Sequence, residues 1–124
     1  MLNLRPGQVF YDLGCGDGRL LIAATEQEAK AVGYEINPLL ALLAWLRTRR
    51  RSQPVKVVWG NFWKADITDA DAVFIFLIDR HMARLDKFLR RQLRGGLVKV
   101  VSYGFKIPGK KPLKESGAIF LYKY

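Results

Sequence analysis

The sequence is poor in the residues that form disulfides and metal clusters. Its 124 residues include one cysteine, Cys15, and one histidine, His81. A single cysteine cannot form a disulfide within the chain. One cysteine and one histidine are also too few ligands for a zinc cluster. We interpret Cys15 as a small residue in a turn and His81 as a helix-surface residue. The lack of disulfides is typical of a reducing compartment, so we expect a cytoplasmic protein.

Long apolar runs are also missing. The longest, residues 39–46, has eight residues, whereas a membrane-spanning helix needs about 20. We interpret this run as a buried helix. The first residues contain no charged leader followed by an apolar segment, so no signal peptide is predicted. A chain of this length is predicted to form one domain, residues 1–124.

Acidic residues are scarce: 11 Asp and Glu face 21 Lys and Arg, which gives a net charge of +10. This charge favours contact with nucleic acid, an anionic membrane surface or an acidic protein surface, without choosing among them. The basic residues gather at a predicted helix end, along a later helix and in a loop: Arg47, Arg49, Arg50 and Arg51; Arg84, Lys87, Arg90, Arg91 and Arg94; Lys106, Lys110, Lys111 and Lys114. They form either a solvated face or a surface that contacts phosphates.

Segments typical of strands alternate with segments typical of helices. Strands are expected at residues 9–13, 31–35, 55–59, 72–77, 97–103 and 118–122, and helices at 18–29, 38–50 and 80–93. Residues 60–71 have room for one helical turn at most, and residues 106–116 are expected to form an exposed loop. This alternation predicts an α/β fold with a doubly wound, mostly parallel sheet whose last strand is antiparallel. Such sheets bind ligands beyond the carboxyl ends of their strands.

A glycine-rich loop follows the first strand and carries Gly14, Gly16 and Gly18. Glycines suit a tight turn that a ligand approaches closely. The spacing differs from the G-x-G-x-x-G of dinucleotide-binding proteins. With Asp12 before it, the loop resembles the nucleotide-binding loop of class I S-adenosylmethionine (SAM) methyltransferases, which have a Rossmann-like fold.

That resemblance assigns cofactor-binding roles to six residues around the loop: Tyr11, Asp12, Gly14, Cys15, Gly16 and Gly18. It implies that the backbone N–H groups of the loop meet the carboxylate of the methionine moiety. It also implies that Asp12 accepts from the ammonium group of that moiety.

Two further strand ends carry side chains suited to the same ligand. Glu35 ends the second strand, 23 residues after Asp12, and a carboxylate there can accept both ribose hydroxyls; Ile36 follows it. Asn61 and Phe62 follow the third strand, where an amide can pair with the adenine edge and an aromatic ring can cover its face. Taken singly, Glu35 is favoured as an exposed acid and Asn61 as a turn residue; the order and spacing of both together with the glycine loop favour the SAM site.

Longer segments resemble one family of protein-lysine methyltransferases. The resemblance rests on Tyr11-Asp-Leu-Gly-Cys-Gly-Asp-Gly-Arg19, Val32-Gly-Tyr-Glu-Ile-Asn-Pro38, Gly60-Asn-Phe-Trp-Lys64, Asp71-Ala-Val-Phe-Ile-Phe76 and Gly117-Ala-Ile-Phe-Leu-Tyr122. The family includes the mitochondrial enzymes that act on an ATP synthase subunit and on the adenine nucleotide translocase, with prokaryotic relatives. Its members usually carry an N-terminal segment, often helical, before the first strand. We therefore expect a minimal version that lacks this helix, either naturally or through truncation, and whose exposed apolar surface a second copy can cover.

The resemblance implies methyl transfer from SAM to a lysine amine. Free lysine has a pKa near 10.4, so the amine must first lose a proton, and an apolar slot favours this loss. The slot candidates are Trp63, Tyr103 and Phe105, for which core packing is equally expected, and Phe76, for which core packing is favoured. Asp79, beyond the fourth strand, either orients the amine or, as we favour, caps the next helix.

Other functions stay open. An RNA methyltransferase would use the basic residues for phosphate contacts, a small-molecule methyltransferase would need no such surface, and a non-catalytic module would bind SAM alone. The absence of Asn-Pro-Pro-Tyr after the fourth strand argues against adenine-N6 and glutamine-N5 methyltransferases. We expect a protein partner, with nucleic acid less favoured, and membrane-surface contact and a homodimer as further options.

Overall fold

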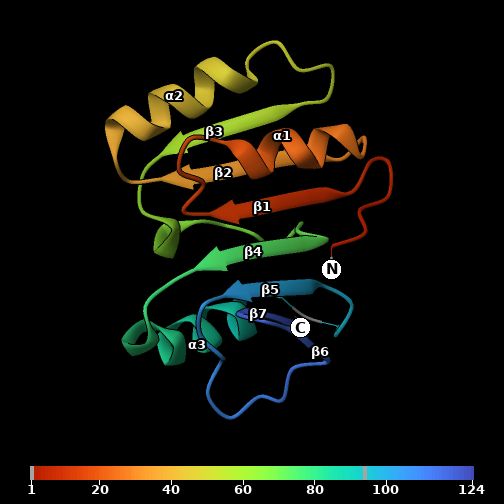
Figure 1. Ribbon diagram of the computed structural model, residues 1–124, viewed down its shortest axis with the longest axis vertical. Coiled ribbons are helices and arrows are strands. Elements are labelled where there is room, and N and C mark those ends of the chain that lie inside the picture. The colour runs from red at the N-terminus through yellow and green to blue at the C-terminus, as the bar shows by residue number, and fades with distance from the viewer. Residues whose placement is uncertain (1, 94) are drawn as a thin grey trace.

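The computed structural model describes residues 2–93 and 95–124, so Met1 and Arg94, which we assigned to the basic stripe, lie outside the described residues. A seven-stranded sheet, ordered β3-β2-β1-β4-β5-β7-β6, forms the centre of the molecule (Figure 1). The strands are β1 (Val9–Leu13), β2 (Lys30–Glu35), β3 (Val55–Trp59), β4 (Ala72–Phe76), β5 (Lys99–Tyr103), β6 (Lys114–Ser116) and β7 (Ile119–Lys123). The strand order reverses between β1 and β4, which are parallel neighbours.

The sheet is parallel from β3 through β5, and β7 pairs antiparallel with β5. The predicted antiparallel last strand is therefore confirmed. The prediction that residues 106–116 form a loop throughout is wrong at its end, because β6 pairs antiparallel with β7. β6 has three residues, all exposed, so no apolar alternation reveals it in the sequence. The hairpin turn at Gly117, whose φ is +58°, brings β6 onto β7.

Three α-helices pack on the sheet among the described residues: α1 (Arg19–Glu26), α2 (Pro38–Thr48) and α3 (Met82–Gln92). Alternate residues of β1 enter opposite cores, Phe10 with Leu21 of α1 and Tyr11 with Leu85 of α3. Helices α1 and α2 thus cover one face and α3 the other (Figure 1), which confirms the doubly wound fold. Residues 2–8, which precede β1, contain no helix.

The ends of two helices show which capping predictions hold. The Asn37 side chain accepts hydrogen bonds from the backbone N–H groups of Leu39 and Leu40, and Pro38 is the first residue of α2, as the sequence predicts. The prediction that Asp79 caps the next helix is wrong. Asp79 lies inside a 3₁₀ turn, η2 (Asp79–His81), and neither η2 nor α3 has a side-chain cap. The chain leaves β4 through this turn, which places the carboxylate within the turn instead of before it.

The interpretation of residues 39–46 as a buried helix is wrong as well. Helix α2 buries Ala41, Ala44 and Thr48, while its leucines are exposed. The helix lies so close to the glycine loop that a Cβ atom at Gly18 would be 3.2 Å from Ala44 Cα. Only small residues fit against such a neighbour, so the larger side chains point outward.

Two structural features do not occur among the described residues. None of the helices in this part of the chain has the length and apolar composition that a bilayer span requires. Within the same residues, no three His, Cys, Asp or Glu side chains gather as metal ligands would.

Candidate functional site

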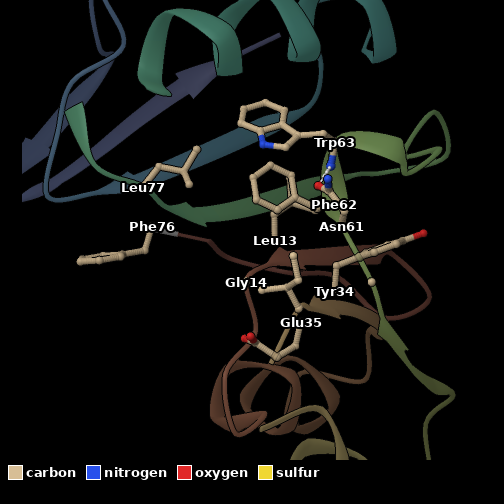
Figure 2. Close-up of a pocket in the computed structure, with 11 residues that line it drawn as sticks. Leu13, Gly14, Tyr34, Glu35, Asn61, Phe62, Trp63, Phe76 and Leu77 are labelled. Atoms are coloured by element: carbon tan, nitrogen blue, oxygen red, sulfur yellow. Dashed lines mark hydrogen bonds between the residues drawn. The ribbon is translucent and has the colours of Figure 1, made fainter. Parts of the chain in front are cut away.

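A cavity of about 290 Å³ opens at the carboxyl ends of β1, β2 and β4, next to the point where the strand order reverses (Figure 2). Crevices at this place in a doubly wound sheet are the usual ligand sites. The lining residues are Leu13, Gly14, Tyr34, Glu35, Ile36, Gly60, Asn61, Phe62, Trp63, Phe76 and Leu77. Most of these side chains are apolar, and Glu35 and Asn61 supply polar groups.

The glycine loop borders this cavity. Its glycines have the left-handed backbone conformation that only glycine adopts readily. Gly14, Gly16 and Gly18 have φ values of +92°, +56° and +91°. The N–H groups of Gly14 and Cys15 donate to the Tyr34 carbonyl at 2.8 and 2.9 Å. These two amides therefore hold the loop against β2 instead of pointing at a ligand.

Glu35 fastens the same loop from the end of β2. One carboxylate oxygen accepts from the Gly16 N–H at 2.8 Å and the other from the Asn37 N–H at 2.9 Å. The side chain is largely buried yet borders the cavity. Each carboxylate oxygen has a second lone pair, so Glu35 can accept hydroxyl groups while it holds the loop.

Asp12 is buried directly behind the loop, with 2% of its surface exposed. Burial, and then the negative charge of Glu35, raise the pKa of Asp12 to about 7. Burial and the charges of Asp12 and Glu35 likewise raise the pKa of the Cys15 thiol to about 12. Two close carboxyl groups favour a cationic ligand, which would offset their repulsion. The thiol stays protonated and is not a nucleophile, as expected of a packing residue.

Asn61 shapes the other side of the cavity. Its side-chain oxygen accepts from the Trp63 N–H at 3.0 Å and so caps the short 3₁₀ turn η1 (Phe62–Lys64); the single helical turn predicted between residues 60 and 71 is confirmed. The amide nitrogen of Asn61 has two N–H donors for a ligand. The rings of Phe62 and Trp63 are 4.6 Å apart, and the Arg84 guanidinium covers the Trp63 ring at 4.2 Å.

Phe76 ends β4 at the far rim, where it points away from Phe62 and Trp63 (Figure 2). The prediction that Phe76 packs in the core is wrong, because 55% of its surface is exposed. Its ring lies 5.4 Å from that of Tyr103 at the end of the neighbouring strand β5. Phe105 is exposed too. Three of the four aromatic slot candidates thus separate into Trp63 on one side and the Phe76 and Tyr103 pair on the other.

Some of the predicted site residues line the cavity, and others do not. Those on the cavity are Gly14, Glu35, Ile36, Asn61, Phe62 and Trp63; those off it are Tyr11, Asp12, Cys15, Gly16, Gly18, Asp79 and Tyr103. Tyr11 lies on the same face of the sheet as Leu13 but further from the strand end, and its hydroxyl donates to Asp69 at 2.6 Å.

Sequence reasoning missed Leu13, Tyr34, Gly60 and Leu77 as lining residues. Each of these four residues lies at or next to a strand end, and this position could have identified them from the sequence. Side chains alternate along a strand, so the neighbouring residues Tyr11 and Asp12 lie on opposite faces of the sheet.

Comparisons with known proteins agree with this geometry. The family model of the ANTKMT methyltransferase domain matches residues 12–114. A protein-lysine N-methyltransferase of Saccharolobus islandicus (strain REY15A) is 38% identical over 84% of this chain and 66% of its own length. The adenine nucleotide translocase lysine N-methyltransferase of Mus musculus is 35% identical over 94% of this chain and 52% of its own length. The chain therefore spans between half and two thirds of the length of these curated relatives.

A solved structure shares the whole architecture. It is described as an RNA methyltransferase from Salinibacter ruber in complex with S-adenosyl-L-homocysteine, and it superposes with a TM-score of 0.83 and 32% identity. The match covers 94% of this chain and 79% of that one.

Proposed function

The chain belongs to the ANTKMT methyltransferase domain family, and from that premise we propose that it is a SAM-dependent protein-lysine N-methyltransferase. One observation carries the proposal: a carboxylate, Glu35, and an amide, Asn61, border one apolar cavity where the strand order reverses. This is the set of groups that a nucleoside with an adenine base and a ribose requires.

The residues present fit SAM as the cofactor. Glu35, Asn61 and Phe62 all line the cavity, where Glu35 would accept from the ribose hydroxyls, Asn61 would donate to the adenine and Phe62 would cover the base face. Asp12 and Glu35 place two acidic groups close together, which suits the cationic methionine end. When bound, SAM supplies a sulfonium methyl group that is open to in-line attack by an amine. S-adenosylhomocysteine in the Salinibacter ruber structure supports the same ligand here.

The acceptor is a lysine that enters beside the aromatic pair. Phe76 and Tyr103 form an apolar wall, with ring centroids 5.4 Å apart, that disfavours the charged ammonium and holds the neutral amine in line. Trp63 borders the inner end of the cavity. Asp79 is exposed beyond β4, where its carboxylate can accept a hydrogen bond from the incoming amine and orient it. These residues position the amine, and no strong base is required.

Protein lysine is the acceptor that the names of two relatives support. RNA is the second candidate, because the Salinibacter ruber relative is described as an RNA methyltransferase and the net charge here is +10.

The buried free thiol of Cys15 fits a reducing compartment such as the cytoplasm.

One experiment separates the two acceptors. The purified protein is incubated with methyl-labelled SAM and a cell lysate, and portions are treated with RNase or with protease. We expect the label to survive RNase and to disappear with protease, and mass spectrometry of the labelled band then identifies the lysine. Label that survives protease and disappears with RNase would establish the RNA methyltransferase instead.

A further inference from the structure

The outer face of α2 is apolar although it contacts no other described element. Leu39, Leu42, Leu43 and Leu46 recur at helical spacing on the side opposite to the buried Ala41, Ala44 and Thr48. Between 38% and 76% of each leucine's surface is exposed. A surface helix normally shows the reverse pattern, with leucines toward the sheet and small or polar residues outside.

Neighbouring side chains extend this surface to the edge of the sheet. Trp59 ends β3, the edge strand, with 68% of its surface exposed, and its indole N–H donates to the Ile36 carbonyl at 3.0 Å. Trp45 lies on the flank of α2, where it lines a groove of about 240 Å³ with Trp59. We call this surface the α2 patch; its residues are Ile36, Leu39, Leu42, Leu43, Trp45, Leu46 and Trp59.

The segment that carries the α2 patch has charged side chains of one sign. Residues 36–65 contain no Asp or Glu, and their basic side chains are Arg47, Arg49, Arg50, Arg51, Lys56 and Lys64. Arg47 lies 4.0 Å from the Asp17 carboxylate and Arg51 3.8 Å from that of Glu26. Arg49 and Arg50 are exposed at the end of the helix, and the Arg49 guanidinium lies 5.5 Å from the centre of the Trp45 ring.

We propose that the α2 patch docks on an anionic lipid bilayer. Leucines of a helix that lies on a membrane enter the boundary between headgroups and acyl chains, tryptophans sit at headgroup level, and arginines pair with anionic headgroups. RNA offers no surface that would bury the leucines. A second copy would place two surfaces with an excess of basic side chains against each other. The bilayer is the partner that matches both the apolar area and the charge.

This docking brings the functional site to the membrane surface. Ile36 belongs to the α2 patch and also lines the cavity, so the cavity opens beside the docked face. The docking depends only on the surface of α2 and β3, and it is testable without methyl transfer.

The test is a flotation assay with vesicles of phosphatidylcholine alone and vesicles with about 30% phosphatidylglycerol. We expect the purified protein to bind the anionic vesicles at least about tenfold better, with binding that weakens as salt rises. The double variant Leu42→Gln/Leu46→Gln should bind at least about tenfold less, because two inserted side chains are lost. Arg49→Gln/Arg50→Gln should lose most of the preference for anionic vesicles.

Matched controls are Leu97→Gln and Leu113→Gln, which alter leucines that are 81% and 61% exposed, before β5 and β6 and away from the β3 edge. Both should bind as the unaltered protein does, and circular dichroism checks that every variant is folded. Equal binding to the two vesicle types, no binding, or equal losses in the control variants would overturn the proposal. So would a dimer in analytical ultracentrifugation that Leu42→Gln/Leu46→Gln dissociates and that does not float with vesicles.

Discussion

A 2.8 Å hydrogen bond joins the Gly16 amide of the glycine loop to the Glu35 carboxylate at the end of β2. The second oxygen of this carboxylate holds the Asn37 amide, just before α2. One side chain thus connects the loop, a strand end and a helix start around the cavity. Glu35 therefore has a structural role in addition to its proposed contact with the ribose.

The first prediction tests whether Glu35 belongs to the cofactor site. Glu35→Gln keeps the size of the side chain but replaces one acceptor oxygen by a donor and removes the charge. We expect SAM affinity, measured by calorimetry, to fall by about 10- to 100-fold, since hydrogen bonds to charged groups contribute ~1.5–3 kcal/mol. Glu26→Gln, a change of the same kind on the exposed side of α1, should leave affinity unaltered. Undiminished binding by folded Glu35→Gln would remove Glu35 from the cofactor site.

The second prediction concerns the pH dependence of stability. The pKa of Asp12 is raised to about 7, whereas an unfolded chain has the ordinary value near 3.8. Between these values the native state keeps a proton that the unfolded state releases, so the free energy of unfolding falls as pH rises from about 4 to 7. Above pH 7 the full cost of the buried charge is present, roughly 4 kcal/mol.

Asp12→Asn should remove this cost. Urea unfolding should show the variant to be more stable than the unaltered protein at pH 8, and the difference should shrink toward zero near pH 4. The control is Leu97→Gln, an exposed change that alters no titratable group, and it should show no such trend. A stability difference that stays constant from pH 4 to pH 8 would contradict the raised pKa of Asp12.

The third prediction tests the packing beneath the glycine loop. A Cβ atom at Gly33 would lie 2.7 Å from both Cys15 Sγ and Leu21 Cδ1. Gly33→Ala should therefore push the loop away and destabilise the protein by roughly 1–3 kcal/mol, and SAM affinity should fall as well. Gly60→Ala is the matched control, because the nearest atom to its Cβ would be Val58 Cγ1 at 3.8 Å. Similar thermal midpoints for the two variants would rule out the close contact.

The parts of the fold that the sequence predicted are those that local chemistry dictates. Gly14 and its two partners in the loop require positive φ angles, Asn37 and Pro38 have the chemistry of a helix start, and the central strand β4 is a continuous apolar run. Glu35 and Asn61 were predicted to lie near each other because parallel strands end at one edge of the sheet, and both line the cavity.

The wrong predictions concern segments whose amino-acid sequence is compatible with more than one packing arrangement. In residues 39–46 every side chain is apolar, so no periodicity marks the buried face; the proximity of Gly18 to Ala44 determines it. Phe76 ends an apolar strand, yet its exposure depends on whether another segment covers that rim. Asp79 would have been a cap if β4 had led directly into a helix, but a 3₁₀ turn intervenes.

The last prediction addresses the acceptor side of the reaction. Tyr103 is 43% exposed and packs against Phe76, so Tyr103→Ala should fold normally and bind SAM with unchanged affinity. Methyl incorporation into the lysate substrate should nevertheless fall by about tenfold or more, because the amine loses the wall that keeps it neutral and aligned. Tyr103→Phe distinguishes the ring from the hydroxyl: if the apolar wall is what matters, this variant keeps most of the activity. Equal methylation by Tyr103→Ala and the unaltered protein would instead move the lysine path to the Trp63 side, since that is the other aromatic border of the cavity.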